Sequence, residues 1–130
     1  MDLQHAKTEF EHYLDGYDRN DDKVHLKIVH TYGVTEYSRQ IAERLNLPDE
    51  DRELAQLIGL LHDIGRFEQL KRFDSFEPDT MDHASFGVQI LFSEGMIRNF
   101  AGKDSWDGII QTAIARHSDF RLTGITDSRT

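Results

Sequence analysis

The sequence predicts an all-α protein, folded as a compact bundle of about five to six helices. Three observations support this prediction. Apolar residues recur with a period near 3.6 along most of the chain, which is typical of one face of a helix. No pair of alternating segments flanks a tight turn, so no β-hairpin is indicated. The two prolines, Pro48 and Pro78, fall where the helical pattern is interrupted.

The first part of the chain carries two amphipathic segments. Residues 2–17 place apolar side chains on one stripe and predict the first helix. Residues 16–22 are polar and indicate a loop. Residues 24–45 form the longest periodic run and predict the second helix. Its apolar face is expected to contain Leu26, His30, Val34, Tyr37, Ile41 and Leu45.

A third helix is predicted after Pro48. It begins with the acidic residues 49–51, which suit the positive end of the helix dipole. Apolar residues continue to Leu61, and Gly65 is a plausible C-terminal stop. Residues 66–80 show no clean period and predict a loop or short turns.

The helical period returns in the last part of the chain. Residues 82–94 predict a fourth helix, and a short segment follows at 96–100. Residues 105–117 predict the last helix. The tail after Asp119 is polar and carries no clear pattern.

Composition narrows the class of protein. A chain of 130 residues suits one domain, which we place at 1–130. Hydrophobic residues make up 38% of the chain, and no apolar run is long enough to span a membrane. The N-terminal residues do not resemble a secretory signal. Cysteine is absent, which excludes disulfides, thiolate metal sites and cysteine nucleophiles. We therefore expect a cytoplasmic protein that does not enter a membrane.

The net charge of −9 bears on the choice of partner. A broad nucleic-acid surface needs clustered lysine and arginine, so none is expected. A small phosphorylated substrate remains compatible with this charge, because a bound divalent cation would reverse the local field in a pocket.

Histidines provide the main functional signal. His30, His83 and His117 lie on the apolar stripes of three predicted helices, and His62 ends the apolar run of another. A His-Asp pair such as His62-Asp63 is expected by chance in a chain of this composition, and a single histidine on an apolar face is usually a hydrogen-bonded core residue. Four such histidines on four helices would be costly to bury unless they shared a purpose. A metal site would satisfy their inward-facing nitrogens.

The ligand types fit a divalent transition metal. Imidazole and carboxylate suit Mn, Fe, Co, Ni or Zn, and Mg is a further option. Neighbouring side chains on a helix diverge by about 100°, so His62 and Asp63 reach one site only where their helix ends. Asp63 has two oxygens and could bridge two ions. His30 and His62 would then hold the first ion, and His83 and His117 the second.

These residues lie in segments that resemble the HD superfamily of metal-dependent phosphohydrolases. The matching text is KIVHTYGVTEYSRQIAERL, AQLIGLLHDIGRFEQ, DHASFGVQIL and IIQTAIARHSDF, which together span about residues 23–120. The resemblance implies a helical bundle of the HD type with one or two metal ions. It also implies hydrolysis of a phosphate ester, from a nucleotide or another small phosphorylated metabolite, by a metal-activated water.

The resemblance suggests roles for individual side chains. Asp63 would bridge the ions and orient the attacking water. Arg66 would hold the substrate phosphate, although a solvated loop arginine is an equal reading. Asp82 could orient His83, but an ordinary acidic residue at a helix N-terminus is favoured.

One departure from the family pattern leaves alternatives open. The pattern ends with a further aspartate on a downstream helix, whereas Asp119 and Asp127 lie in the polar tail. We expect that the chain is truncated at its C-terminal end; a natural variant with an incomplete site is the alternative. Other functions to weigh are a catalytically silent metal- or nucleotide-binding regulatory module, a di-iron oxygenase, and a helical interaction domain without metal. An HD-GYP phosphodiesterase is disfavoured because RFEQLKRFDSFEPDT lacks the Gly-Tyr-Pro signature.

Overall fold

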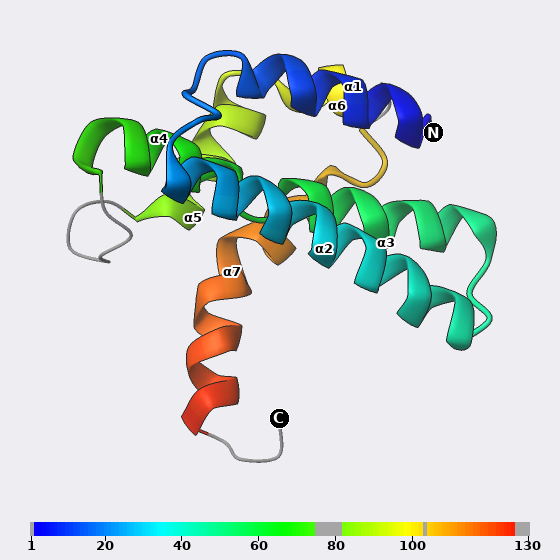
Figure 1. The fold of residues 1–130 in the computed structure, drawn as a ribbon. Helices are drawn as coiled ribbons and strands as arrows, with labels where there is room; N and C mark the ends of the chain where they lie inside the picture. The colour runs from blue at the N-terminus through cyan, green and yellow to red at the C-terminus, as the bar shows by residue number, and fades with distance from the viewer. Residues whose placement is uncertain (1, 75–81, 103, 127–130) are drawn as a thin grey trace.

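The prediction of an all-α fold is confirmed. The computed structural model describes residues 2–74, 82–102 and 104–126, and at 117–126 only the backbone. Within these ranges every regular element is a helix (Figure 1). The elements are α1 (Leu3–Leu14), α2 (Asp22–Arg44), α3 (Asp49–Leu61), α4 (Ile64–Phe73), α5 (His83–Val88), the π-helical η1 (Gln89–Ser93), α6 (Ile97–Phe100) and α7 (Asp107–Thr126). Across this part of the chain, no helix has both the length and the apolar character that a membrane span requires.

α1 and α2 begin after acidic residues whose side chains accept hydrogen bonds from free backbone amides. Asp2 accepts a hydrogen bond from the His5 amide at 3.0 Å at the start of α1. Asp21 accepts from the amides of Lys23 and Val24 at the start of α2. Such capping is typical of Asp before a helix. α3 starts after Pro48 with three acidic residues in its first turn, as predicted.

The core lies between α1, α3 and the shorter helices. Figure 1 shows α1 crossing above the antiparallel pair α2 and α3, with α4 and α5 at one end of the molecule. Phe10 of α1 and Phe67 of α4 are completely buried, and their rings meet edge-to-face at 6.0 Å. Ile110 and Ile114 of α7 are also fully buried. Burial of such side chains is the main stabilising contribution to a fold of this kind.

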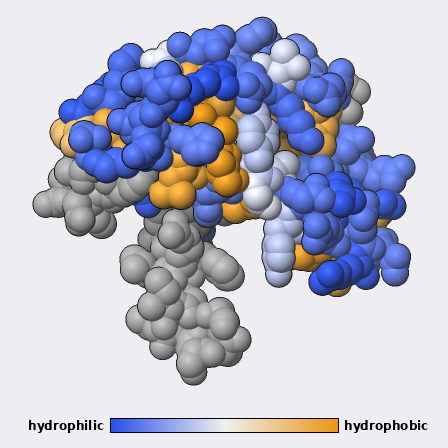
Figure 2. Space-filling view, viewed as in Figure 1, coloured by the Kyte–Doolittle hydropathy of each residue, from blue (hydrophilic) through white to orange (hydrophobic). Residues whose placement is uncertain are grey.

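The predicted apolar face of α2 is wrong. Leu26, Tyr37 and Leu45 are 60%, 63% and 65% exposed, so most of this face is turned to solvent, whereas His30 on the same face contacts Asp63. Figure 2 shows apolar side chains on the surface where α2 faces the viewer. The side chains of α2 that are buried are instead Val24, Thr31, Thr35 and Ala42.

Small residues explain why α2 turns its other face inward. A Cβ atom on Gly59 of α3 would lie 3.2 Å from both the Cα of Thr35 and the Oγ of Ser38. The backbones of α2 and α3 therefore approach closely, which only a row of small side chains allows. Residue size, not hydropathy alone, determines the inward face of α2.

The segment after His62-Asp63 also differs from the prediction. Residues 66–80 were expected to form a loop, but α4 covers 64–73, and residues 75–81 lie outside the described residues. Ile64, Phe67 and Leu70 recur at three-residue spacing and form the buried side of α4. The charged residues between them obscure this period in the sequence.

Gly65 does not end α3 as predicted. α3 ends at Leu61, and Gly65 lies buried in the first turn of α4. A Cβ atom there would lie only 2.0 Å from the carbonyl oxygen of His83. Gly65 thus allows α4 and α5 to pack backbone against backbone.

The remaining helices agree broadly with the expectation. The predicted helix at 82–94 divides into α5 and η1, in which a wider π-helical turn accommodates the last residues. The segment predicted at 96–100 is α6. The last helix is longer than expected, because α7 extends from Asp107 to Thr126.

Candidate metal centre

The break between α3 and α4 places a charged carboxylate in the interior. Asp63 adopts φ −112° and ψ 20°, which interrupts the helical course and lets α4 start at Ile64. The side chain of Asp63 is 0% exposed. A buried carboxylate is costly unless positive charge and hydrogen-bond donors surround it.

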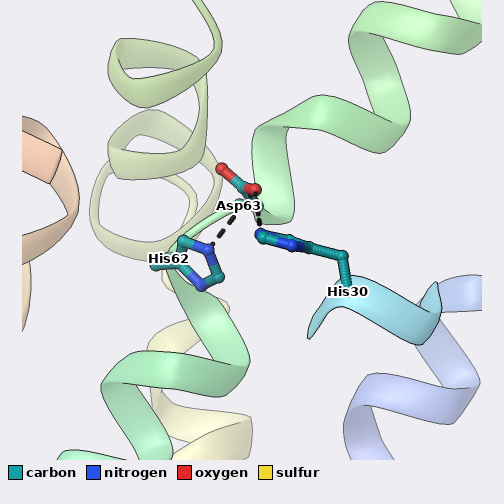
Figure 3. A group of neighbouring side chains, drawn as sticks. All are labelled: His30, His62 and Asp63. Atoms are coloured by element: carbon teal, nitrogen blue, oxygen red, sulfur yellow. Dashed lines mark ion pairs between the residues drawn. The ribbon is translucent and has the colours of Figure 1, made fainter. Parts of the chain in front are cut away.

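Four basic side chains surround Asp63. Its Oδ2 atom lies 2.9 Å from the Nζ of Lys27, 3.3 Å from the Nε2 of His62 and 3.5 Å from the Nε2 of His30. Its Oδ1 atom lies 3.5 Å from the Nε2 of His83. Figure 3 shows His30 and His62 facing the carboxylate from two different helices. The two carboxylate oxygens therefore face different sets of nitrogens.

His62 has a ring orientation that indicates a cation. Its Nδ1 atom lies 2.6 Å from the carbonyl oxygen of Gly59. Because a carbonyl only accepts, Nδ1 carries the proton, and a neutral ring then presents the Nε2 lone pair to Asp63. Two acceptors 3.3 Å apart are favoured when a cation lies beside them, such as the ammonium of Lys27, 2.9 Å from Oδ2, or a metal ion. This fixing of one ring nitrogen by a carbonyl is typical of metal-binding histidines.

The donor atoms of His30, His62 and Asp63 are close enough to share one ion. These atoms lie within 4.8 Å of one another. Their side chains are 40%, 14% and 0% exposed respectively, so the group opens to solvent on the side of His30. Two imidazoles and a carboxylate are a suitable donor set for a divalent transition metal. The described residues therefore fit a metal ion at this position.

The local sequence explains how His83 reaches the site. It is the first residue of α5, and the preceding Asp82 accepts hydrogen bonds from the amide and the hydroxyl of Ser85 at 3.2 and 2.8 Å. Hydrogen bonding to Ser85 lowers the pKa of Asp82. This geometry supports the favoured reading of Asp82 as an ordinary helix cap. Gly65 permits the close approach that brings His83 to Asp63.

α1 holds the other side of the break in place. The hydroxyl of Tyr13 donates to the carbonyl oxygen of Ile64, the residue after Asp63, at 3.1 Å. Burial raises the pKa of Tyr13 to about 12, so the phenol stays protonated and remains a donor at neutral pH. The start of α4 is thus attached to α1 immediately beside the carboxylate.

Arg66 lies in a different setting from the one expected. It belongs to α4 and not to a loop, and its Nη1 donates to the Oε1 of Gln69 at 2.9 Å. Gln69 is itself 0% exposed. A role for Arg66 in binding phosphate stays a prediction.

The other histidines divide into two groups. His117 lies on α7, but its side chain is outside the described residues, so its part in a second metal site stays a prediction. The side chain of Asp119 and the whole of Asp127 also lie outside the described residues. The side chains of His5 and His12 are 54% and 66% exposed, so these two histidines lie at the surface.

Sequence reasoning missed Lys27. It precedes His30 by three residues on α2, so both side chains lie on the same side of the helix. That spacing was the available signal, but lysine is normally read as a solvated residue. Here its side chain is only 12% exposed and contacts the carboxylate.

The helical fold and the His-His-Asp group, whose carboxylate is buried, define a helical domain with a candidate metal centre. Comparison with protein-family models matches residues 28–127 to the HD domain. This chain belongs to the HD domain family. The matched range includes His30, His62, Asp63 and His83. Neither the curated proteins nor the solved structures gave a match.

Proposed function

We propose that this protein is a metal-dependent phosphohydrolase acting on a small phosphate ester, such as a nucleotide or another phosphorylated metabolite. One observation carries the proposal: the buried carboxylate of Asp63 faces three imidazole nitrogens, from His30, His62 and His83, at 3.3–3.5 Å. Membership in the HD domain family supports a hydrolytic use of such a centre.

Each residue of the centre would have its own role. His30, His62 and Asp63 would hold the first divalent ion, which supplies a Lewis acid and lowers the pKa of a bound water. His62 would keep its orientation through Gly59, which fixes the direction of Nε2. Asp63 would accept a hydrogen bond from the attacking water and so orient it. The partly exposed side of His30 would admit the substrate.

His83 supports a second ion in the same proposal. It faces Oδ1 of Asp63, whereas His30 and His62 face Oδ2. Asp63 would then serve as a ligand of both ions, since each of its oxygens faces a different set of imidazoles. His117 is the proposed additional ligand of that second ion. Arg66 is the proposed phosphate-binding side chain, one turn after Asp63 on α4.

The experiment is a measurement of phosphate release. The purified chain is incubated with nucleoside mono-, di- and triphosphates and a simple phosphomonoester, in the presence of Mn²⁺, Co²⁺ or Ni²⁺. We expect turnover that is lost in Asp63→Asn, because the variant keeps the shape of the side chain but removes its charge. Asp49→Asn is the matched control: the Asp49 side chain is 89% exposed at the start of α3, so activity should be retained. Metal binding without any phosphate release would reject the hydrolase.

A catalytically silent metal-binding regulatory module is the second candidate. The observation in its favour is that, in the part of the chain that the structure describes, the group able to share one ion consists of two imidazoles and a single carboxylate. Such a module would bind metal in the same assay without turnover, and a nucleotide would then bind without being hydrolysed.

A further inference from the structure

Lys27 makes the shortest of the four contacts with Asp63. Its Nζ lies 2.9 Å from Oδ2, against 3.3 Å or more for each imidazole. Its side chain is only 12% exposed. The ammonium is therefore drawn into the interior by the carboxylate, since lysine is rarely buried without such a partner.

The contact falls on the oxygen that a metal ion would use. Oδ2 is the atom that both His30 and His62 face, at 3.5 and 3.3 Å. An ion held by these two imidazoles would lie against the same oxygen as the ammonium. Two positive charges beside one carboxylate oxygen repel each other, and the burial of Asp63 and of most of Lys27 weakens the screening by water. The position of Lys27 is therefore suited to the metal-free protein.

We propose that Lys27 is a built-in counter-cation of the metal-free centre, displaced from Asp63 when the metal binds and then turned toward the phosphate of the substrate. The second half of this inference rests on the proposed function. The ammonium neutralises the buried carboxylate before the metal arrives, which keeps the site folded. Afterwards the side chain is still anchored on α2 beside the centre, where a phosphate would bring compensating negative charge.

Lys23 provides a matched control on the same helix. It lies one turn earlier on α2 and contacts Asp74 instead, with its Nζ 3.2 Å from Oδ1 and 2.8 Å from the carbonyl oxygen. Its side chain is 47% exposed. The substitution Lys23→Met removes one positive charge from the same part of α2 and leaves the contacts of Asp63 unchanged.

The first test measures metal affinity by calorimetric titration with Mn²⁺ alone. We expect Lys27→Met to bind Mn²⁺ about tenfold more tightly than the wild type, because the competing charge is gone. Lys23→Met should stay within about twofold of the wild type, since its charge is exposed and screened. Methionine is suitable because its thioether is a poor ligand for the hard Mn²⁺ ion. Lys27→Arg keeps the charge and should not show the gain.

Each outcome of the Mn²⁺ titration either supports or overturns the inference about Lys27. Equal or weaker binding by Lys27→Met would overturn the inference, and so would a failure of both proteins to bind Mn²⁺. Binding by Lys27→Met but not by the wild type would support it. These outcomes do not depend on turnover. If the protein binds metal but releases no phosphate, the proposed hydrolase is rejected, whereas the inference about Lys27 is not affected.

The second test uses the wild-type chain and does not require a variant to fold. Lysine side chains are labelled with an acetylating reagent and quantified by mass spectrometry, without metal, with Mn²⁺, and with Mn²⁺ and inorganic phosphate. We expect labelling of Lys27 to rise several-fold on addition of Mn²⁺ and to fall again with phosphate, while Lys23 stays constant. No rise with Mn²⁺ would contradict displacement, and a rise without protection would contradict the phosphate contact.

Discussion

At the scale of single residues, the centre depends on which atoms can donate and which can only accept. The carbonyl of Gly59 fixes the proton on Nδ1 of His62 and so directs the lone pair of Nε2 at Asp63. The same carboxylate attracts the ammonium of Lys27. These two contacts make the group a candidate site for a cation. They depend on the local geometry of the folded chain and cannot be read from the residue types alone.

A second residue-scale network joins α1 to α2 and responds to pH. Glu11 accepts hydrogen bonds from the hydroxyl of Tyr32 and from Nη1 of Arg19. The hydrogen bond from Tyr32, together with Arg19, lowers the pKa of Glu11 below its ordinary value of 4.5. A lowered pKa means that the ionised carboxylate stabilises the fold. This contribution is complete above pH 4.5 and is lost as the pH falls through the lowered pKa.

We therefore predict a pH-dependent effect of Tyr32→Phe. At pH 7 the variant should lose about 0.5–1 kcal/mol of unfolding free energy, a small value because solvent partly screens Glu11. The difference from the wild type should shrink as the pH falls below 4.5 and through the lowered pKa of Glu11, since Glu11 is then protonated in both folded proteins. Urea unfolding at several pH values measures it. Tyr37→Phe is the control, since Tyr37 is 63% exposed, and a difference independent of pH would contradict the role of Glu11.

At the scale of helices, the sequence predicted the existence of most elements better than their faces and ends. The periodicity identified α1, α2, α3 and α7 because each carries recurrent apolar residues. The periodicity predicted the wrong buried side for α2. Hydropathy does not reveal that Gly59 of α3 lets the small residues of α2 approach closely. The periodicity also missed α4, where charged residues alternate with the buried ones.

For the candidate site too, the sequence indicates which residue types are suitable better than it indicates where they lie. His30, His62, Asp63 and His83 could be singled out because imidazole and carboxylate suit a metal, and the structure brings all four together. Lys27 could not be singled out, since a lysine near a helix N-terminus is usually solvated. Its contact with Asp63 depends on how α2 and the α3–α4 break are oriented, which is a property of the assembled helices.

The contact between α4 and α5 gives a prediction at this scale. In Gly65→Ala the new Cβ would meet the carbonyl oxygen of His83 at 2.0 Å, so one of the two helices must move. We expect a loss of about 1–3 kcal/mol in unfolding free energy and weaker metal binding, because His83 moves with α5. Denaturant unfolding and Mn²⁺ titration measure the two effects.

Gly33→Ala is the matched control for that change. Gly33 lies inside α2, and a Cβ there would have no atom within 4 Å. Alanine should therefore stabilise the helix by about 0.5–1 kcal/mol. If Gly65→Ala were as stable as the wild type, the close backbone contact would not determine the position of His83.

At the scale of the whole molecule, the candidate ligands come from three separate parts of the chain. His30 belongs to α2, His62 and Asp63 to the break between α3 and α4, and His83 to α5 (Figure 1). An ion held by these residues would tie together segments that are far apart in sequence. It would bind the folded chain and not the unfolded one, so it must stabilise the fold by mass action.

This linkage predicts a metal-dependent melting temperature. With free Mn²⁺ at about 100 times its dissociation constant, the unfolding free energy should rise by about 2.7 kcal/mol. For a domain of this size the rise corresponds to an increase of roughly 10 °C in Tm. Differential scanning calorimetry with Mn²⁺, followed by addition of EDTA to reverse the shift, measures it. Asp63→Asn should show almost no shift, whereas Asp49→Asn should match the wild type because its carboxylate lies in solvent at the start of α3. An equal shift in Asp63→Asn would place the stabilising ion elsewhere on this acidic chain, whose net charge is −9.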